Sequence, residues 1–138
     1  MALREGLREL AAVNCGAQAD LTVVAAAEAV LRRAPLLVDL AGGGAPRLTA
    51  AGDHARPLDD GAGAALLAAA VAMDAYLAVR ARGEWRRLKV CGSPDCRWAF
   101  VDATRNRSRR WCDMAGCGNR AKNRAWRDRQ NLVTNKLG

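Results

Sequence analysis

Four of the five cysteines in this chain occur as two pairs with the same internal spacing. Four residues separate Cys91 from Cys96, four separate Cys112 from Cys117, and fifteen lie between the pairs. Turn-forming residues fill both short gaps, so each pair can close around one ion. Structural zinc is held tetrahedrally by four such thiolates, which leave no open position for a substrate. The spacing therefore predicts a structural Zn²⁺ ion on these four cysteines.

Two disulfides or an iron–sulfur cluster are the alternatives for the same cysteines. No run of about 18 uninterrupted apolar residues and no signal segment is evident, which predicts a cytoplasmic protein with no membrane partner. In that reducing compartment metal ligation is favoured over disulfides. Nothing around the pairs favours a cluster. The fifth cysteine, Cys15, has no basic neighbour and is interpreted as a small packing residue.

The positive charge of the chain is concentrated at its C-terminal end. The whole chain carries a net charge of +8, yet residues 1–85 hold 8 Lys and Arg against 10 Asp and Glu. Residues 86–138 hold 14 against 4, a net charge of +10. This asymmetry is typical of a nucleic-acid-binding module attached to a neutral or acidic domain, although a merely solvated face has the same composition.

Two segments of the basic region could contact phosphates or bases. One is the turn 104–108 with its flanks, and the other is a helix expected from Cys117 to about Leu132. Arg binds phosphates or guanine edges through its planar fork, whereas a solvated Arg-rich helix needs neither partner. The candidate nucleic-acid contacts are Arg105, Arg107, Arg109, Arg110, Arg120, Lys122, Arg124 and Arg127.

The remaining elements follow from periodicity and breakers. Helices are expected over about 2–14, 20–33 and 58–82, the second nearly all apolar and therefore central. A small hairpin joins 36–40 to 47–50, with a turn at 42–46 and a loop at 51–57 after it. Within the finger, a second hairpin is expected to pair 98–102 with 109–112. The predicted fold is mainly α with small β-hairpins, comprising a helical domain (1–84) and a treble-clef-like zinc finger with four cysteine ligands (85–138).

All four tryptophans lie in or just before the basic module. They are Trp85, Trp98, Trp111 and Trp126. A metal domain of about fifty residues needs large side chains for its small core, which favours packing. Base stacking is the alternative, and it would indicate single strands or RNA.

Several of these residues together resemble the CGNR zinc finger. The resemblance rests on residues 108–112, on Met114, and on residues 117–120 with Lys122, together with Cys91-x4-Cys96 and Phe100-x-Asp102 upstream. Members of that family are regarded as DNA-binding, stress-induced transcription regulators. They usually carry a helical ABATE domain before the finger, and residues 3–8 with Asn14 are similar to its middle portion. The start of that domain is not evident in the chain.

Motif and charge together predict a zinc-dependent, DNA-binding transcription regulator. Its partner would be duplex DNA, placing it at the nucleoid, and its N-terminal domain would form a homodimer or sense a small-molecule effector. The alternative is an RNA-binding or protein-interaction module in which zinc only maintains the surface. No paired carboxylates, open metal site or activated nucleophile is present, and His54 stands alone, so no enzymatic activity is expected.

Overall fold

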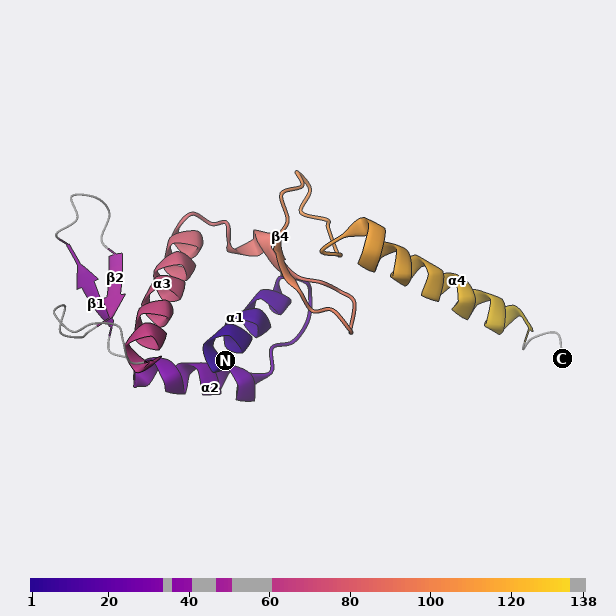
Figure 1. Ribbon diagram of the computed structural model, residues 1–138. Coiled ribbons are helices and arrows are strands. Elements are labelled where there is room, and N and C mark those ends of the chain that lie inside the picture. The colour runs from indigo at the N-terminus through magenta and orange to yellow at the C-terminus, as the bar shows by residue number, and fades with distance from the viewer. Residues whose placement is uncertain (34–35, 41–46, 51–60, 135–138) are drawn as a thin grey trace.

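The computed structural model describes residues 1–33, 36–40, 47–50 and 61–134 (Figure 1). The described elements, in chain order, are α1 (Ala2–Val13), α2 (Leu21–Arg32), β1 (Leu36–Asp39), β2 (Arg47–Ala50), α3 (Gly61–Ala81), the short 3₁₀ turn η1 (Trp85–Arg87), β3 (Leu88–Val90), β4 (Ala99–Val101), the π-helical turn η2 (Met114–Gly118) and α4 (Asn119–Thr134). The predicted fold class, mainly α with two small antiparallel strand pairs and a four-cysteine finger, is confirmed.

α1 and α2 pack closely because small residues line their contact. The α-carbon of Gly6 lies so near Ala27 that a methyl group at position 6 would overlap the Ala27 side chain. Gly6, Ala11 and Ala12 are the buried residues of α1, and Ala27 is the only buried residue of α2. The prediction that the second helix is central is therefore wrong: its short side chains are apolar on every side, but only one narrow face is covered.

The N-terminus of α2 is set by Asp20. Its carboxylate accepts hydrogen bonds from the backbone N–H groups of Thr22 at 2.9 Å and Val23 at 3.3 Å. Such a cap satisfies donors that have no partner within the helix. The boundary is therefore determined locally, and it agrees with the sequence expectation to within one residue.

The first hairpin lies against α3. β1 and β2 are antiparallel, with Leu36 opposite Ala50 and Asp39 opposite Arg47. Asp74 of α3 accepts a hydrogen bond from Leu48 N at 2.9 Å and pairs with Arg47 at 3.6 Å. These contacts fix the hairpin to the helix. The expected turn at 42–46, the loop at 51–57 and the first residues of the expected third helix lie outside the described residues.

α3 is the longest of the described helices and is rich in apolar residues. Its segment Gly63–Ala81 has a mean hydropathy of 1.6 and is long enough to cross a membrane, judged by length and composition only. Only 11% of it is buried. The segment is interrupted by Asp74, which is why a search for an uninterrupted apolar run does not find it.

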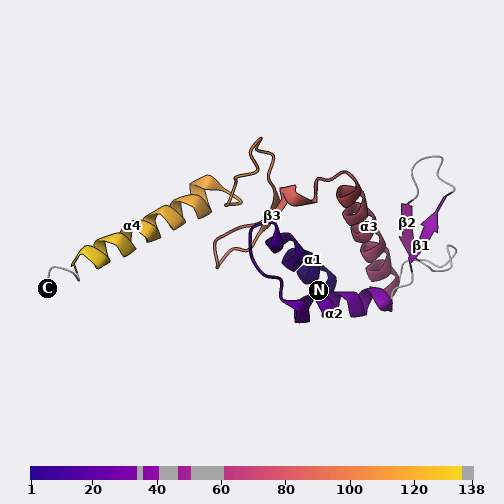
Figure 2. The ribbon, with the colours of Figure 1, turned by 180° about the vertical axis from the view of Figure 1, so that it is seen from behind.

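The C-terminal end of α1 contacts the finger directly. Ala11 and Ala12 form a buried cluster with Val90 of β3, and Trp85 and Leu88 pack against it. The Asn14 side-chain amide donates to the carbonyls of Trp85 and Leu88, each at 2.8 Å. In Figures 1 and 2, α1 accordingly lies between α2 and the β3–β4 pair. The helical segment and the finger thus share a core.

Cys15 also contributes to the contact between the end of α1 and the finger. Its Sγ accepts a hydrogen bond from Val90 N at 3.3 Å and lies 3.4 Å from Val90 O. The residue is exposed. The thiol therefore satisfies backbone groups of β3, a more specific role than the packing residue expected from the sequence.

The predicted pairing of 98–102 with 109–112 is wrong. β4 instead pairs antiparallel with β3, which places Leu88 opposite Val101 and Val90 opposite Ala99. Residues 109–112 form no strand. The physical reason lies in Asp102, whose carboxylate accepts the Arg109 N–H and so draws the returning chain towards a side chain instead of a ladder.

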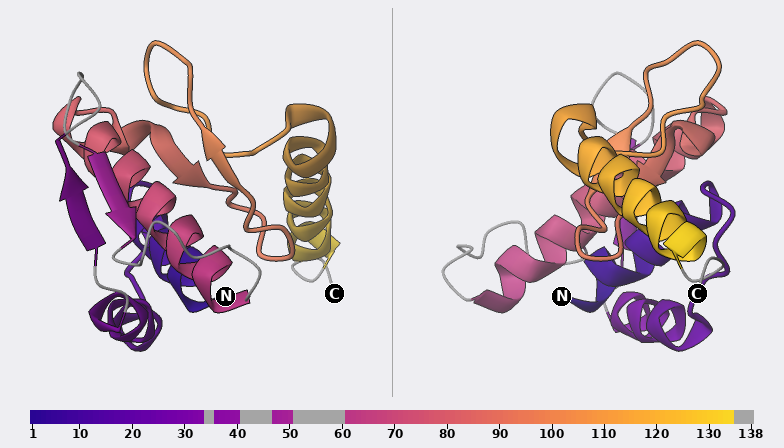
Figure 3. Two further views of the ribbon diagram at one scale, coloured as in Figure 1. Left: turned by 60° about the vertical axis from the view of Figure 1, so that its left-hand side comes forward. Right: turned by 90° about the vertical axis from the view of Figure 1, so that its right-hand side faces the viewer.

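Helix α4 extends away from the rest of the molecule (Figures 1 and 2), and Figure 3 shows the same helix from two further sides. Its main packing partner is η2, the turn that immediately precedes it. Of the side chains described between Asn119 and Asn131, only that of Ala121 is partly covered. A helix with polar residues on nearly all sides gains little from burial, so this one presents its surface to solvent or to a partner.

Candidate metal centre and the basic surface around it

The first cysteine pair occupies the connection between β3 and β4. Cys91 follows β3 directly, and its backbone N–H donates to Trp98 O at 2.9 Å. The Ser93 carbonyl accepts from the N–H groups of Cys96 at 3.0 Å and of Arg97 at 3.2 Å, and Arg97 adopts a positive φ of 48°. These bonds turn the chain sharply enough for both thiols to face the same point.

The second pair is shaped by Asp113 and by a glycine. The Asp113 carboxylate accepts the N–H of Ala115 at 3.3 Å and that of Gly116, which caps the turn η2. A methyl group at Gly118 would overlap the Met114 sulfur and lie 3.3 Å from the Trp111 ring. A larger residue there would displace the Met114 side chain and press on the Trp111 ring. Cys117 lies within this turn and is buried.

The two pairs bring four sulfur atoms together. All four Sγ atoms lie within 4.8 Å of one another. The distance from Cys96 to Cys112 is 3.7 Å, and that from Cys112 to Cys117 is 3.8 Å. Four ligands at about 2.3 Å from a tetrahedral zinc ion would have sulfurs about 3.8 Å apart. The separations are far too long for disulfides, so the four cysteines are positioned to bind a metal ion, in agreement with Zn²⁺.

The crowding of four thiols shifts their acidities. Burial and then the neighbouring thiols raise the pKa of Cys112 to about 12. At Cys91 burial acts in the same direction, but hydrogen bonds from the backbone of Cys112 and Ser93 outweigh it and lower the pKa to about 7. Ionisation of all four thiols thus requires a cation among them, and metal binding must release protons.

Arg120 supplies positive charge to this cluster. Its guanidinium lies 3.1 Å from the Cys117 sulfur, and the thiolate raises the pKa of Arg120. A site with four thiolates around Zn²⁺ carries a net charge of −2, which a neighbouring cation stabilises. Arg124, one turn further along α4, lies 3.4 Å from Asp95 in the first pair. Two of the arginines predicted to contact nucleic acid therefore bind the finger itself.

A buried ion pair fixes the loop between the cysteine pairs. Asp102 is fully buried, and its carboxylate accepts from Lys89 Nζ at 2.8 Å. The same carboxylate accepts from Thr104 Oγ1 at 2.6 Å and from the backbone N–H groups of Thr104 and Arg109, each at 2.9 Å. Lys89, followed by Thr104, holds the pKa of Asp102 well below its usual range. Lys89 also donates to the carbonyls of Arg107 and Arg109. The ion pair between Lys89 and Asp102 was not predicted from the sequence.

The basic loop is exposed, and its arginines differ in their contacts. Arg109 lies over the Phe100 ring at 5.1 Å, and its Nε donates to Trp111 O at 2.8 Å. Arg110 lies 5.5 Å from the Trp111 ring. Among the described residues, the side chains of Arg105 and Arg107 have no partner. The outer part of the loop therefore offers two free guanidinium groups.

On α4 two cations without a partner among the described residues lie opposite the arginines that bind the finger. Lys122 and Arg129 are seven residues apart, which places them on one helix face, and Trp126 falls between them on that face. All three are exposed, Trp126 by 57%. Arg129 was not among the predicted contacts, although the same helical periodicity identifies it. Arg127 is exposed as well, on the face of Arg120 and Arg124.

The tryptophans divide into two groups. Trp85 packs edge to face against Tyr76, with ring centroids 4.8 Å apart, and Trp111 lies against Gly92 and Gly118. Trp98 and Trp126 are 67% and 57% exposed. The packing interpretation thus fits the first two and is wrong for the other two.

The order of these parts, with one cysteine pair in a β-connection and the second entering a helix, defines a metal-binding finger with four cysteine ligands. Residues 87–130 match the family model of the CGNR zinc finger. The chain therefore carries a CGNR zinc finger over these residues. No curated protein matches the chain. The match begins after the three N-terminal helices, so the resemblance of those helices to the ABATE domain stays a prediction.

Proposed function

We propose that this protein is a DNA-binding transcription regulator whose finger is maintained by structural Zn²⁺. Four cysteines in contact with one ion would leave it no site for substrate, so the ion would act on the fold and the chain is assigned no catalysis. Arg120 would offset the negative charge at Cys117, and Asp113 would orient that ligand by capping the turn η2. In this proposal the protein is cytoplasmic and associates with the nucleoid.

The observation that carries the proposal is the free face of α4. Lys122 and Arg129 lie on a helix that projects away from the body of the molecule (Figure 1), and the side chains of Arg105 and Arg107 in the finger loop also have no partner among the described residues. Side chains that already pair within a protein have little to gain from phosphate, whereas these four lose only water. A projecting helix of this width also fits the major groove of duplex DNA.

A salt titration with a matched pair of variants tests the proposal. Binding of a labelled random duplex is measured by fluorescence anisotropy between about 50 and 200 mM salt, where log K should fall linearly with log salt concentration. The double variant Lys122→Ala, Arg129→Ala should weaken binding and reduce the magnitude of the slope by about 2. The control Arg4→Ala, Arg32→Ala removes two exposed cations of α1 and α2 and should change neither quantity.

Equal metal content and circular dichroism spectra establish that the variants retain the fold. Absence of duplex binding by the zinc-loaded protein, or identical slopes for both double variants, would contradict the proposal.

Exposed Trp98 and Trp126 favour one second candidate, a module for single-stranded nucleic acid or RNA. Aromatic side chains stack on unpaired bases, with contributions of about 1–3 kcal/mol per base. Competition between the duplex, single-stranded DNA and RNA distinguishes the two functions. In the second case Trp126→Ala would weaken single-strand binding more than the loss of Lys122 does.

A further inference from the structure

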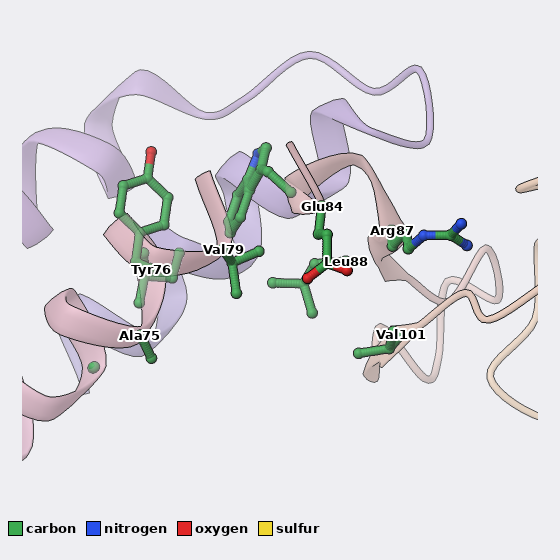
Figure 4. Close-up of a pocket in the computed structure, with 10 residues that line it drawn as sticks. Ala75, Tyr76, Val79, Glu84, Arg87, Leu88 and Val101 are labelled. Atoms are coloured by element: carbon green, nitrogen blue, oxygen red, sulfur yellow. The ribbon is translucent and has the colours of Figure 1, made fainter. Parts of the chain in front are cut away.

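A pocket of about 310 Å³ lies where the N-terminal helices meet the finger (Figure 4). It is distinct from the metal site and from the basic surface. Its wall is mostly apolar and is contributed by α1, α3, η1, β3 and β4. The lining residues are Leu7, Ala72, Ala75, Tyr76, Val79, Glu84, Trp85, Arg87, Leu88 and Val101. The volume falls at the lower end of the range of small-molecule sites and is too small for a helix of a partner protein.

Aromatic rings form one wall of this pocket. Tyr76 and Trp85 meet edge to face, with an interplanar angle of 82°. Arg80 lies 5.9 Å from the Tyr76 ring and 6.0 Å from the Trp85 ring. Rings held in this way offer a further aromatic ring a stacking partner whose position is already fixed.

The two charged residues at the mouth of the pocket, Glu84 and Arg87, differ in whether they are free to bind a ligand. In Figure 4 the Glu84 carboxylate lies beside Leu88, whereas the Arg87 guanidinium points away from the apolar side chains. Arg87 donates to the carbonyls of Asp102 at 3.0 Å and Thr104 at 3.2 Å, so its charge is committed to the finger loop. Arg82 binds Glu84 through Oε2 at 3.1 Å, and among the described residues Oε1 has no partner. The mouth therefore favours a hydrogen-bond donor.

We propose that this pocket binds a small aromatic molecule of one or two rings that carries an amino group. The rings enter between Leu7, Val79 and the Tyr76–Trp85 pair, and the amino group meets Glu84. The site is independent of the proposed nucleic-acid binding, because no residue of the free α4 face lines it.

Three compounds that share one ring system test the chemistry. Tryptamine, indole and indole-3-propionate are titrated into the zinc-loaded full chain by isothermal calorimetry without nucleic acid. A charged hydrogen bond to Glu84 should make tryptamine bind about tenfold more tightly than indole, and the carboxylate of indole-3-propionate should make it the weakest of the three.

Three variants locate the binding. Ala75→Phe places a ring in the pocket from an exposed position and should abolish binding of tryptamine and indole. Ala68→Phe, an exposed residue of α3 outside the pocket, should leave binding unchanged. Glu84→Gln should retain indole and lose the preference for tryptamine.

No binding of any of the three compounds, or equal binding by Ala75→Phe and Ala68→Phe, would overturn the proposal. Sedimentation velocity on the same variants identifies a different occupant. A dimer of the unmodified chain that Ala75→Phe dissociates would show that a second copy covers this surface, and it would likewise overturn the small-molecule site.

Discussion

The N-terminal helices and the C-terminal finger are stabilised in different ways. α1 and α2 approach closely where Gly6 meets Ala27, and the other buried residues of α1, Ala11 and Ala12, are equally small. The finger has equally little apolar core, but each of its turns is held by an identifiable polar group such as Asp102, Asp113 or a cysteine.

The two regions should therefore respond to different kinds of substitution. The contact between α1 and α2 depends on the shapes of small side chains, so a larger side chain in this contact cannot be accommodated without moving a helix. A finger held by an ion and an ion pair depends on a few charges, and it should lose its structure cooperatively when one is removed.

The largest expected effect is that of removing the metal. Cys117→Ser, or addition of a strong chelator, should abolish the tertiary structure of the finger, because four thiols without a cation repel further ionisation and have little core to support them. Near-ultraviolet circular dichroism of Trp98 and Trp111 reports the loss. The helical signal should fall less than the aromatic signal, because the α1–α2 contact at Gly6 and Ala27 does not involve the finger, whereas Ala11 and Ala12 lose their contact with Val90.

Cys15→Ser is the matched control, because this cysteine lies outside the metal cluster. Retention of one zinc per chain by the control and its loss in Cys117→Ser is the expected result of elemental analysis. Since Cys112 has a raised pKa and must lose its proton to bind metal, zinc affinity should also fall as the pH falls. A finger that keeps its structure in chelator would contradict this view.

The next effect in size concerns the buried ion pair. Asp102→Asn removes the charge that compensates buried Lys89 and should lower the melting temperature of the zinc-loaded protein by about 10 °C. Asp128→Asn, an exposed acid on α4, is the control and should change it little. Differential scanning calorimetry measures both. Similar melting temperatures for the two variants would show that Asp102 contributes no more than a surface charge.

A smaller effect is expected in the helical region. Gly6→Val would push α1 away from Ala27 and should lower the free energy of unfolding by about 1–3 kcal/mol. Gly61→Val, where a side chain would meet nothing within 4 Å, serves as the comparison. Urea denaturation followed at 222 nm gives both values. An unchanged rate of zinc release in Gly6→Val would show that the α1–α2 contact does not stabilise the metal site.

The smallest effect is that of Arg120, which adjusts the metal site without forming it. Arg120→Gln removes the cation next to Cys117 and should weaken zinc binding about tenfold. Competition with a chromogenic chelator measures this affinity. Arg127→Gln, on the same face of α4 with no contact to the cysteines, should leave it unaltered. An equal loss in both variants would show that the overall charge of the helix, and not the contact, determines affinity.

The cysteines that come together, the helices and the fold class were all predictable from the sequence alone. Cysteine spacing and hydrophobic periodicity are local properties of the sequence, which is why these predictions agree with the structure to within a few residues. The surplus of positive charge in the finger was equally visible, because formal charge does not depend on the fold.

Only the tertiary structure decided which partner each polar group has. The pairing of β4 with β3, and not with 109–112, depends on Asp102 meeting Lys89 thirteen residues away. Arg120 and Lys122 are equivalent in the sequence, yet one contacts a thiolate and the other solvent, since α4 leaves η2 at a particular rotation. Strand pairing and helix rotation depend on contacts between distant residues, and such contacts exist only once the chain has folded.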